Sequence, residues 1–180
     1  TYIKQLPNRD MGWCISPFQA ILTINDIRTL RSRVDVLSQN TMKVARFLAK
    51  HPKISNVNYL GLDDHPLHEV ASKYLWLVDA EHDEQYGKPV NRYGHLMSFE
   101  FKGEVAAARR FMDGLKRIWR ATDLGRIESV ATIPAISTHQ QMGEDLRDMA
   151  NIPADLVRLC IGAEHPDDMI ADLEQALNKA

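Results

Sequence analysis

The sequence predicts an α/β sandwich of two layers, in which three or four strands form a sheet that is covered by helices. Short apolar stretches with strand-like patterns alternate along the chain with longer stretches whose apolar residues recur every three or four positions. A chain of 180 residues with 44% apolar residues is also long enough for one substantial hydrophobic core. We therefore expect one principal domain, preceded by a long helix.

Composition excludes several functions. The formal net charge is −2 and there is no basic run, so electrostatics gives no basis for binding nucleic acid or an acidic membrane surface. No stretch approaches the roughly 20 apolar residues that a bilayer span requires, and the N-terminus has no signal-peptide pattern. Cys14 and Cys160 are too few and too far apart for a disulfide framework. We expect a soluble chain in a reducing, cytoplasmic setting.

The first 50 residues predict a tail and a long helix. Residues 1–15 are polar and rich in turn-forming residues, with no helix or strand signal. Ser16 can then cap a helix, and Gln19 can complete a capping box with it. Apolar residues continue in steps of three and four until His51: Val34, Leu37, Val44 and Leu48. One continuous helix over 16–50 would be roughly 50 Å long at 1.5 Å per residue, long enough to reach a second body.

The next segment predicts a strand, a helix and a loop. Residues 54–60 have the composition of a short strand, and the turn residues Gly61, Asp63 and Asp64 follow it. A helix that begins at Pro66 would bury one apolar face, formed by Val70, Ala71, Tyr74, Leu75 and Val78. Residues 79–93 are charged and contain glycine and proline, which predicts an exposed loop.

The remaining elements alternate between strands and helices. Residues 96–101 alternate in polarity and predict a strand that places Met97, Phe99 and Phe101 on one face. A helix is expected over 104–118 and a short strand over 129–133. Thr138 and Gln141 form a second capping box, which predicts a helix with Met142, Leu146 and Met149 along it. A strand over 156–161 and a last helix from Pro166, with Ile170, Leu173 and Leu177 buried, complete the fold.

Arg158 is the anomaly of the sequence, because it interrupts the apolar strand 156–161. Burying an unpaired charge costs several kcal/mol or more, so arginine is almost never fully buried without a partner. An anion should therefore meet the guanidinium. An internal salt bridge to Asp123, Glu128 or Glu164 is one possibility, and an external anionic ligand is the other.

Other candidate sites are weaker. His65 and His68 have the spacing of two metal ligands, but no third or fourth ligand follows, and we interpret them as surface histidines. Cys160 shares a strand face with Arg158, and a buried structural cysteine is the simpler interpretation than a reactive thiolate. No glycine-rich dinucleotide or phosphate loop is present. We therefore predict no metal site and no nucleotide site.

Eight collinear motifs closely resemble the C-terminal part of the Cys/Met-metabolism pyridoxal-phosphate enzymes. These trans-sulfuration enzymes include cystathionine gamma-synthase, cystathionine lyase, methionine gamma-lyase and O-acetylhomoserine sulfhydrylase. The motifs are Ser16-Pro17-Phe18-x-Ala20 with Thr29-Leu30-x-x-Arg33; His51-Pro52; Tyr59-Leu-Gly-Leu62 with His65-Pro66-x-His68; Ser98-Phe99-Glu100-x-Lys102-Gly103; Leu124-Gly125-x-x-Glu128-Ser129; Pro134-Ala135-x-x-Thr138-His139; Leu156-Val-Arg-Leu159; and Gly162-x-Glu164. The resemblance implies the small C-terminal domain of a fold-type I pyridoxal-phosphate enzyme over 51–180, with 16–50 as its connecting helix and 1–15 as the tail of an upstream large domain.

The resemblance also implies a substrate site. Arg158 matches the arginine that binds the substrate α-carboxylate, and Thr138 matches a threonine that lines the same pocket. Asp123 falls beside that carboxylate, where many members of the family have serine or asparagine. An ionised Asp123 would repel a carboxylate or occupy Arg158. Arg126 in place of a usual glycine, and Asn25-Asp26 in place of Arg-Gly, indicate a divergent member.

By the same resemblance, the residues that bind pyridoxal phosphate, including the Schiff-base lysine, lie upstream of the region that this chain matches. The chain alone is therefore expected to have no catalytic residue, no cofactor-binding residue and no activity. Its expected partners are a large cofactor-binding domain and further copies in a homodimer or homotetramer. The complete enzyme would perform beta or gamma elimination or replacement on sulfur amino acids or O-acylhomoserine. The alternative is a non-catalytic α/β module that binds an amino acid or a partner protein.

Overall fold

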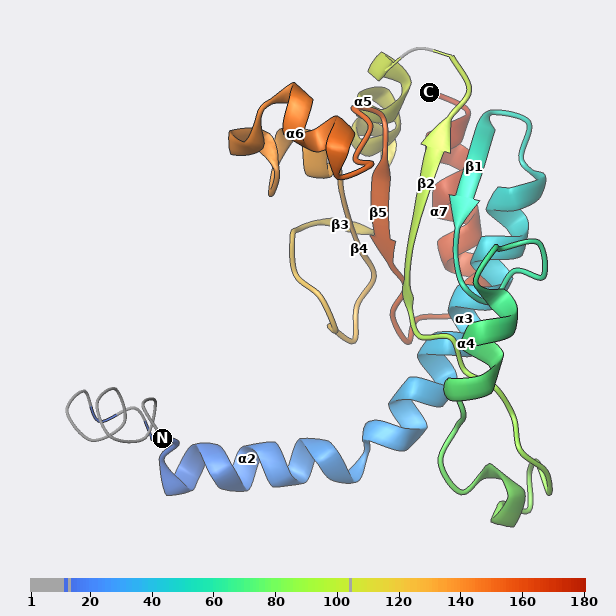
Figure 1. Ribbon diagram of the computed structural model, residues 1–180, viewed down its shortest axis with the longest axis vertical. Helices are drawn as coiled ribbons and strands as arrows, with labels where there is room; N and C mark the ends of the chain where they lie inside the picture. The colour runs from blue at the N-terminus through green and yellow to red at the C-terminus, as the bar shows by residue number, and fades with distance from the viewer. Residues whose placement is uncertain (1–11, 13, 104) are drawn as a thin grey trace. The chain divides into compact units, whose positions relative to one another are not determined.

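The computed structural model describes residues 12, 14–103 and 105–180 (Figure 1). Two compact units are present, Thr1–Ser32 and Arg33–Ala180. Most of the predicted tail over 1–15 lies outside the described residues, and those of its residues that are described form neither helix nor strand. None of the described helices has the length and apolar character that crossing a bilayer requires.

The first helix begins as the sequence predicts. Helix α2 spans Pro17–Arg28, and both hydrogen bonds of the capping box are present at its start. The backbone N–H of Gln19 donates to Ser16 Oγ over 3.2 Å, and the N–H of Ser16 donates to Gln19 Oε1 over 3.0 Å. No residue of α2 is buried within this structure.

The prediction of one continuous helix over 16–50 was wrong. A second helix, α3, spans Leu30–Lys50, and Thr29 separates it from α2 with φ of −102° and ψ of 0°. The Thr29 hydroxyl donates to the carbonyl of Asp26 over 3.2 Å, and the Thr29 N–H donates to the same carbonyl over 3.3 Å. Such local bonds from a threonine side chain compete with helical hydrogen bonding, which explains the break.

The sheet has five strands in the order β1-β2-β5-β4-β3 (Figure 1). The strands are β1 (Ile54–Asn58), β2 (Leu96–Phe101), β3 (Trp119–Arg120), β4 (Val130–Thr132) and β5 (Val157–Cys160). Neighbouring strands are antiparallel except for β3 and β4, which are parallel. The two-residue β3 was missed because it is too short to show an alternating pattern.

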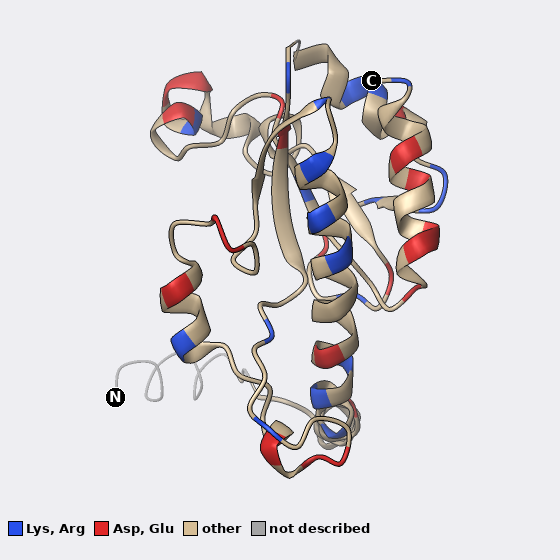
Figure 2. Ribbon diagram, turned by 90° about the vertical axis from the view of Figure 1, so that its right-hand side faces the viewer, with Lys and Arg blue, Asp and Glu red and all other residues tan. Residues whose placement is uncertain are grey.

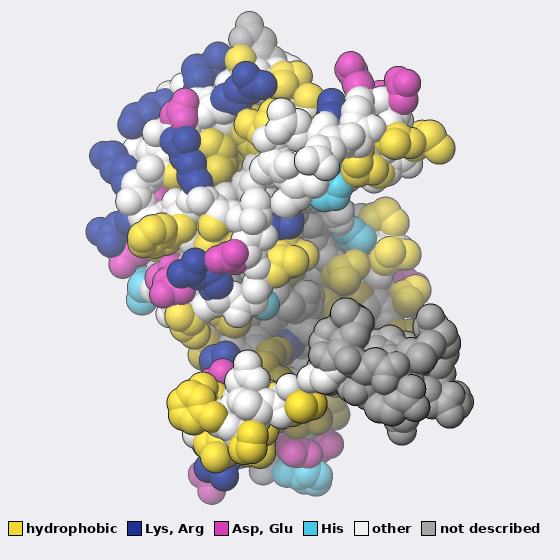
Figure 3. All heavy atoms as spheres, turned by 90° about the vertical axis from the view of Figure 1, so that its left-hand side faces the viewer, with side chains coloured by type: hydrophobic (Ala, Val, Ile, Leu, Met, Phe, Trp, Pro, Cys, Tyr) yellow, Lys and Arg dark blue, Asp and Glu magenta, His cyan; other side chains and the backbone are white. Residues whose placement is uncertain are grey.

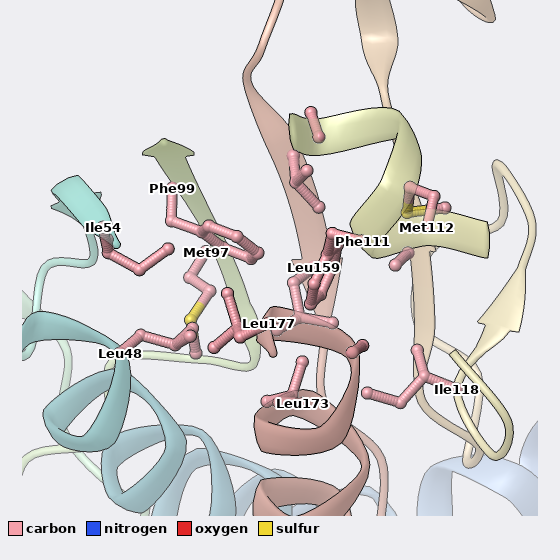
Figure 4. Close-up of a cluster of buried hydrophobic side chains, with 14 of the residues drawn as sticks. Leu48, Ile54, Met97, Phe99, Phe111, Met112, Ile118, Leu159, Leu173 and Leu177 are labelled. Carbon is pink, nitrogen blue, oxygen red and sulfur yellow. The ribbon is translucent and has the colours of Figure 1, made fainter. Parts of the chain in front are cut away.

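Three helices form the second layer of the unit Arg33–Ala180: α3, α5 (Val105–Gly114) and α7 (Pro166–Leu177). Their apolar side chains pack against the β2 face that carries Met97, Phe99 and Phe101, as predicted. Figure 4 shows side chains from α3, β2, β5 and α7 pointing toward one another in this cluster. Phe99 and Phe111 meet edge to face, with ring centroids 5.5 Å apart. The two-layer α/β fold is therefore confirmed.

Helix α5 ends at Gly114, before the predicted end at residue 118. The backbone N–H groups that follow bond to Asp172 of α7 instead of continuing the helix. The buried Asp172 carboxylate accepts hydrogen bonds from the N–H groups of Lys116, Arg117 and Ile118 at 2.8 to 3.0 Å. A carboxylate that satisfies three N–H groups fixes the path of the chain from α5 into β3.

The helix predicted from Pro66 is shorter and more exposed than expected. Helix α4 spans His68–Tyr74, and only Ala71 of the predicted apolar face is buried, while Tyr74 is 77% exposed. The predicted loop 79–93 does contain only a short 3-10 helix, η2 (Ala80–His82), and one isolated bridge between Trp76 and Asn91.

The loop 79–93 is not simply exposed, because it is anchored to α3. Arg92 Nε lies 2.6 Å from Asp35 Oδ1, and the Tyr86 hydroxyl donates to Asp35 Oδ2 over 2.7 Å. Burial of Asp35 tends to raise the pKa of its carboxyl, but the bonds from Tyr86 and Arg92 outweigh that effect and lower the pKa. Local sequence patterns could not predict this contact, because Asp35 lies about 50 residues from Tyr86 and Arg92.

The helix predicted from the Thr138 capping box was also wrong. A 3-10 turn η3 (Pro134–Ile136) is followed by a second one, η4 (Gln140–Met142), and by α6 (Glu144–Met149). Gly143 separates η4 from α6 with φ of 76°, a left-handed conformation that a continuous helix cannot contain. The Thr138 hydroxyl caps no helix and instead hydrogen-bonds to His139 Nδ1 over 2.8 Å.

Candidate anion-binding site

A row of polar side chains crosses the sheet on the face opposite the helices. The strand register pairs Asn58 with Ser98, Ser98 with Arg158, and Arg158 with Thr132. Directly opposed residues of antiparallel strands project from the same face, so these four share one side of the sheet. Val157 and Leu159, which flank Arg158, project to the opposite face and are fully buried in the core.

Arg158 lines a hollow on this polar face, which we call the first hollow. Its volume is about 320 Å³. The lining residues are Asn58, Tyr59, Leu60, Leu96, Met97, Ser98, Pro134, His139, Ile152, Leu156 and Arg158. Most of the lining is apolar, and a few polar groups converge on the space, as is common in small-molecule sites.

Arg158 has no carboxylate partner among the residues that the structure describes. Its one hydrogen bond runs from Nη2 to the carbonyl oxygen of Thr122 over 2.7 Å. This bond orients the guanidinium without neutralising it. The anion that a partly buried arginine is expected to need would therefore come from outside the described part of the chain.

The predicted internal salt bridges of Arg158 are not present, because each candidate carboxylate is engaged elsewhere. Asp123 Oδ2 lies 2.8 Å from Arg126 Nη1, and Glu128 Oε2 lies 3.4 Å from Arg126 Nε. Glu164 accepts two hydrogen bonds from Ser129, one from its N–H and one from its hydroxyl over 3.0 Å. Arg126 is thus the residue that meets Asp123, and the two acidic neighbours raise the pKa of its guanidinium.

A hydrogen-bonded cluster fixes the end of the loop that bears Thr122. The N–H of Gly162 donates to Ser129 Oγ over 2.9 Å, and Asn40 Nδ2 donates to the carbonyl oxygens of Gly162 and Glu164. A Cβ atom at Gly162 would overlap the Ile127 carbonyl oxygen, so only glycine fits. The cluster ties α3, β5 and the loop together and so helps to position the carbonyl that holds Arg158.

The structure brings together only part of the predicted site. Arg158 lines the first hollow, whereas Thr138 and Asp123 do not. Thr138 touches the hollow indirectly, through its hydrogen bond to His139, and Asp123 is ion-paired with Arg126. Three further lining residues, Asn58, Ser98 and His139, were not predicted from the sequence. Ser98 was recognisable in principle, since strand alternation places it opposite Met97 and Phe99.

The weaker candidates behave as structural residues. Burial raises the pKa of the Cys160 thiol, and the nearby charge of Arg158 only partly opposes this, so a reactive thiolate is not favoured. His65 Nε2 hydrogen-bonds to Asn58 Oδ1, and His68 Nδ1 to the carbonyl of Leu60. No group of metal-binding side chains occurs among the described residues.

The first hollow does not offer the primary amine on which pyridoxal-phosphate enzymes depend. No lysine is among its lining residues. Lys53, one of the described lysines, donates instead to the carbonyl oxygens of Leu177 and Ala180 at the C-terminal end of α7. The lining of the first hollow therefore fits an anion and offers no amine for a covalent bond to that cofactor.

The fold and the first hollow together define a small α/β domain with an arginine-lined hollow on one face of its sheet. The chain belongs to the Cys/Met metabolism PLP-dependent enzyme family, whose pattern matches residues 2–178. The cofactor of this family is pyridoxal phosphate.

Individual relatives are longer than this chain. An O-acetyl-L-homoserine sulfhydrylase of Leptospira meyeri is 38% identical over 169 residues, which cover 94% of the chain and 35% of that protein. An L-methionine gamma-lyase of Fusobacterium nucleatum subsp. polymorphum is 37% identical over 178 residues, which cover 98% of the chain and 41% of that protein. The chain thus spans less than half the length of these relatives.

Solved structures show the same fold. A putative O-acetylhomoserine (thiol)-lyase from Campylobacter jejuni, with a pyridoxyl-lysine monophosphate, matches with a TM-score of 0.84 and 35% identity, over 98% of this chain and 38% of that one. Cystathionine gamma synthase from Xanthomonas oryzae pv. oryzae, in complex with cystathionine, matches with a TM-score of 0.79 and 35% identity, over 94% of this chain and 40% of that one.

Proposed function

We propose that this chain is the substrate-binding small domain of a pyridoxal-phosphate-dependent trans-sulfuration enzyme that acts on sulfur amino acids or O-acylhomoserine. Arg158 binds the α-carboxylate of the substrate in the first hollow. The observation that carries the proposal is the guanidinium of Arg158, which lines the hollow without a carboxylate partner in the described part of the chain. A planar carboxylate is the anion that matches a guanidinium fork.

The proposed domain organisation follows the family. Residues 51–180 form the small domain, 16–50 connect it to a large cofactor-binding domain, and 1–15 belong to the end of that domain. The complete enzyme is a homodimer or homotetramer. Relatives more than twice as long as this chain support the presence of a further domain. A reducing, cytoplasmic setting stays a prediction, drawn from the two free cysteines.

In the proposed enzyme, the residues of this chain bind and orient the substrate. The Thr122 carbonyl fixes one side of the Arg158 guanidinium, which leaves its remaining N–H groups for the substrate carboxylate. Ser98 and Asn58 lie in the same cross-strand row, and the apolar part of the lining excludes water from the bound substrate. Pyridoxal phosphate, when bound in the complete enzyme, acts as the electron sink for bond breaking at the beta or gamma carbon.

The complete protein and the isolated chain are expected to differ in activity. A protein that joins this chain to its cofactor-binding domain should release or replace the sulfur substituent at the beta or gamma carbon of a sulfur amino acid, or the acyloxy group at the gamma carbon of O-acylhomoserine. The 180-residue chain alone should do neither, because its first hollow holds no lysine. Product formation is measured by mass spectrometry with equal molar amounts of both proteins. An inactive complete protein that binds pyridoxal phosphate would count against the proposal, as would an active isolated chain.

The Asp123–Arg126 ion pair predicts a second result in the complete enzyme. Arg126→Ala releases the Asp123 carboxylate next to the Thr122 peptide that holds Arg158, and should raise KM about twofold to fivefold, since exposed charges interact weakly. Asp123→Ser alone should change KM less, because Arg126 already holds that carboxylate. The double variant should return KM to the parent value. A double variant as impaired as Arg126→Ala would show that Asp123 plays no part.

A further inference from the structure

A second hollow borders the segment 133–140, which also contributes Pro134 and His139 to the first hollow. Its volume is about 600 Å³, and no residue lines both hollows. Its lining residues are Arg109, Met112, Asp113, Arg120, Ala121, Thr122, Ala131, Thr132, Ile133, Ile136, Ser137 and Gln140. The volume falls in the range of roughly 300 to 1,000 Å³ that is typical of small-molecule sites.

The second hollow is bordered by positive charge. Arg109 belongs to α5 and Arg120 to β3, so two separate elements bring their guanidinium groups to the same space. Asp113 neutralises one of them, since its Oδ1 lies 2.8 Å from Arg120 Nη2. Arg109 makes no hydrogen bond or ion pair to another described residue. Figure 3 shows one face of the molecule, on which basic side chains gather along one margin with acidic and apolar side chains among them.

The remaining polar groups of the second hollow divide into two kinds. Thr132 and Ser137 are satisfied internally, because their hydroxyls bond to each other over 2.8 Å and Ser137 donates to the Ile133 carbonyl. The side-chain amide of Gln140 and the hydroxyl of Thr122 form no hydrogen bond within the described part of the chain. These two groups, with Arg109, keep their hydrogen-bonding capacity for a ligand.

The floor of the second hollow is apolar. Met112, Ala131 and Ile133 are buried to at least nine tenths of their surface and line the hollow. The apolar part of a ligand that lies on this floor would be removed from water, which favours binding. The floor and the single unpaired guanidinium together select a small molecule with one negative charge and an apolar part.

We propose that the second hollow binds a small amphipathic monoanion. The carboxylate of the ligand pairs with Arg109, its apolar body lies on Met112, Ala131 and Ile133, and Gln140 bonds to a polar group if the ligand has one. This site is separate from the proposed substrate site, and its existence does not depend on that function. It does adjoin the first hollow, since Thr122 both lines the second hollow and holds Arg158 through its carbonyl.

The proposal is tested on the full 180-residue chain with 3-phenylpropionate as the probe and 3-phenylpropanamide as its neutral analogue. Titration is followed by the amide shifts of the ¹⁵N-labelled chain. The anion should bind saturably and shift amides of residues 120–122, 131–133 and 136–140. The neutral analogue should bind at least about fivefold more weakly, since it lacks the charge-assisted bond to Arg109.

Three variants decide the assignment. Arg109→Gln should weaken binding of the anion about fivefold or more, because it removes the unpaired charge. Arg117→Gln removes an equal charge outside the lining and should leave the affinity unchanged. Arg158→Gln should weaken binding much less than Arg109→Gln, because Arg158 is connected to the second hollow only through the Thr122 carbonyl; this difference separates the site from the first hollow. Shifts confined to the first hollow, equal affinity for both probes, no saturable binding, or an unchanged affinity in Arg109→Gln would each overturn the proposal.

Discussion

Arg158→Ala, made in the complete enzyme, is expected to raise KM for an amino-acid substrate about tenfold to a hundredfold, because a charge-assisted hydrogen bond contributes roughly 1.5 to 3 kcal/mol. Among the described residues, the substitution removes only the hydrogen bond from the Arg158 guanidinium to the Thr122 carbonyl, and it breaks no ion pair. Arg158→Lys keeps the charge but not the planar fork, and should fall between the parent and the alanine variant. Steady-state kinetics at several substrate concentrations provide KM and kcat.

Two controls make the Arg158 result specific. Bound pyridoxal phosphate, followed by its absorbance, should be unchanged, since the proposed role of Arg158 concerns the substrate and not the cofactor. Arg117→Ala removes a positive charge from a position outside both hollows and should leave KM unaltered. An unchanged KM in Arg158→Ala would reject the carboxylate role, whereas loss of the cofactor would indicate a structural role instead.

Asp172→Ala is expected to lower the free energy of unfolding of the chain by about 3 kcal/mol or more, because each buried N–H left without a partner costs roughly 1 to 3 kcal/mol. Asp172 is 4% exposed, and its carboxylate accepts from the backbone N–H groups of Lys116, Arg117 and Ile118. Gln175 also donates to it over 3.0 Å. Unfolding by urea, followed by circular dichroism, measures the change.

Asp168→Ala is the matched control, because Asp168 occupies the same helix, α7, but is exposed. Its favourable position near the helix N-terminus is worth only about 0.3 to 1 kcal/mol. Asp172→Asn should lie between the two variants, since the amide oxygen still accepts but its NH₂ group faces backbone donors. A loss of less than about 1 kcal/mol in Asp172→Ala would show that water or a shifted chain replaces the carboxylate.

Composition alone predicted the net charge of the chain but not which charged side chains meet. The near-neutral net charge predicts no affinity for nucleic acid, and Figure 2 shows basic and acidic segments interspersed along the helices in that view. Composition did not predict that Arg126 would hold both Asp123 and Glu128, or that Arg109 and Arg120 would border one hollow. Those groupings depend on where loops and helix ends meet in space.

Local patterns predicted elements well where burial and periodicity agreed. The alternation in β2 was confirmed, and so was the stripe of α7 at Leu173 and Leu177, which are fully buried, whereas Ile170 is only partly buried. Errors arose where a local signal had a competitor. The hydroxyl of Thr29 bonds back to Asp26 and breaks the long helix, and Thr138 bonds to His139 instead of capping a helix. A capping sequence shows only that a side chain can form the capping hydrogen bond. Whether that bond forms depends on the surrounding structure.

The sequence by itself determined the family and the strand that carries Arg158, and it predicted that this arginine meets an anion. These follow from local order, because motif spacing and strand polarity are properties of neighbouring residues. Only the tertiary structure decided that Asp123 pairs with Arg126, that Glu164 binds Ser129, and that Arg158 is left without a carboxylate partner in the described part of the chain. Partners tens of residues apart meet through strand register and loop path, which no local pattern specifies.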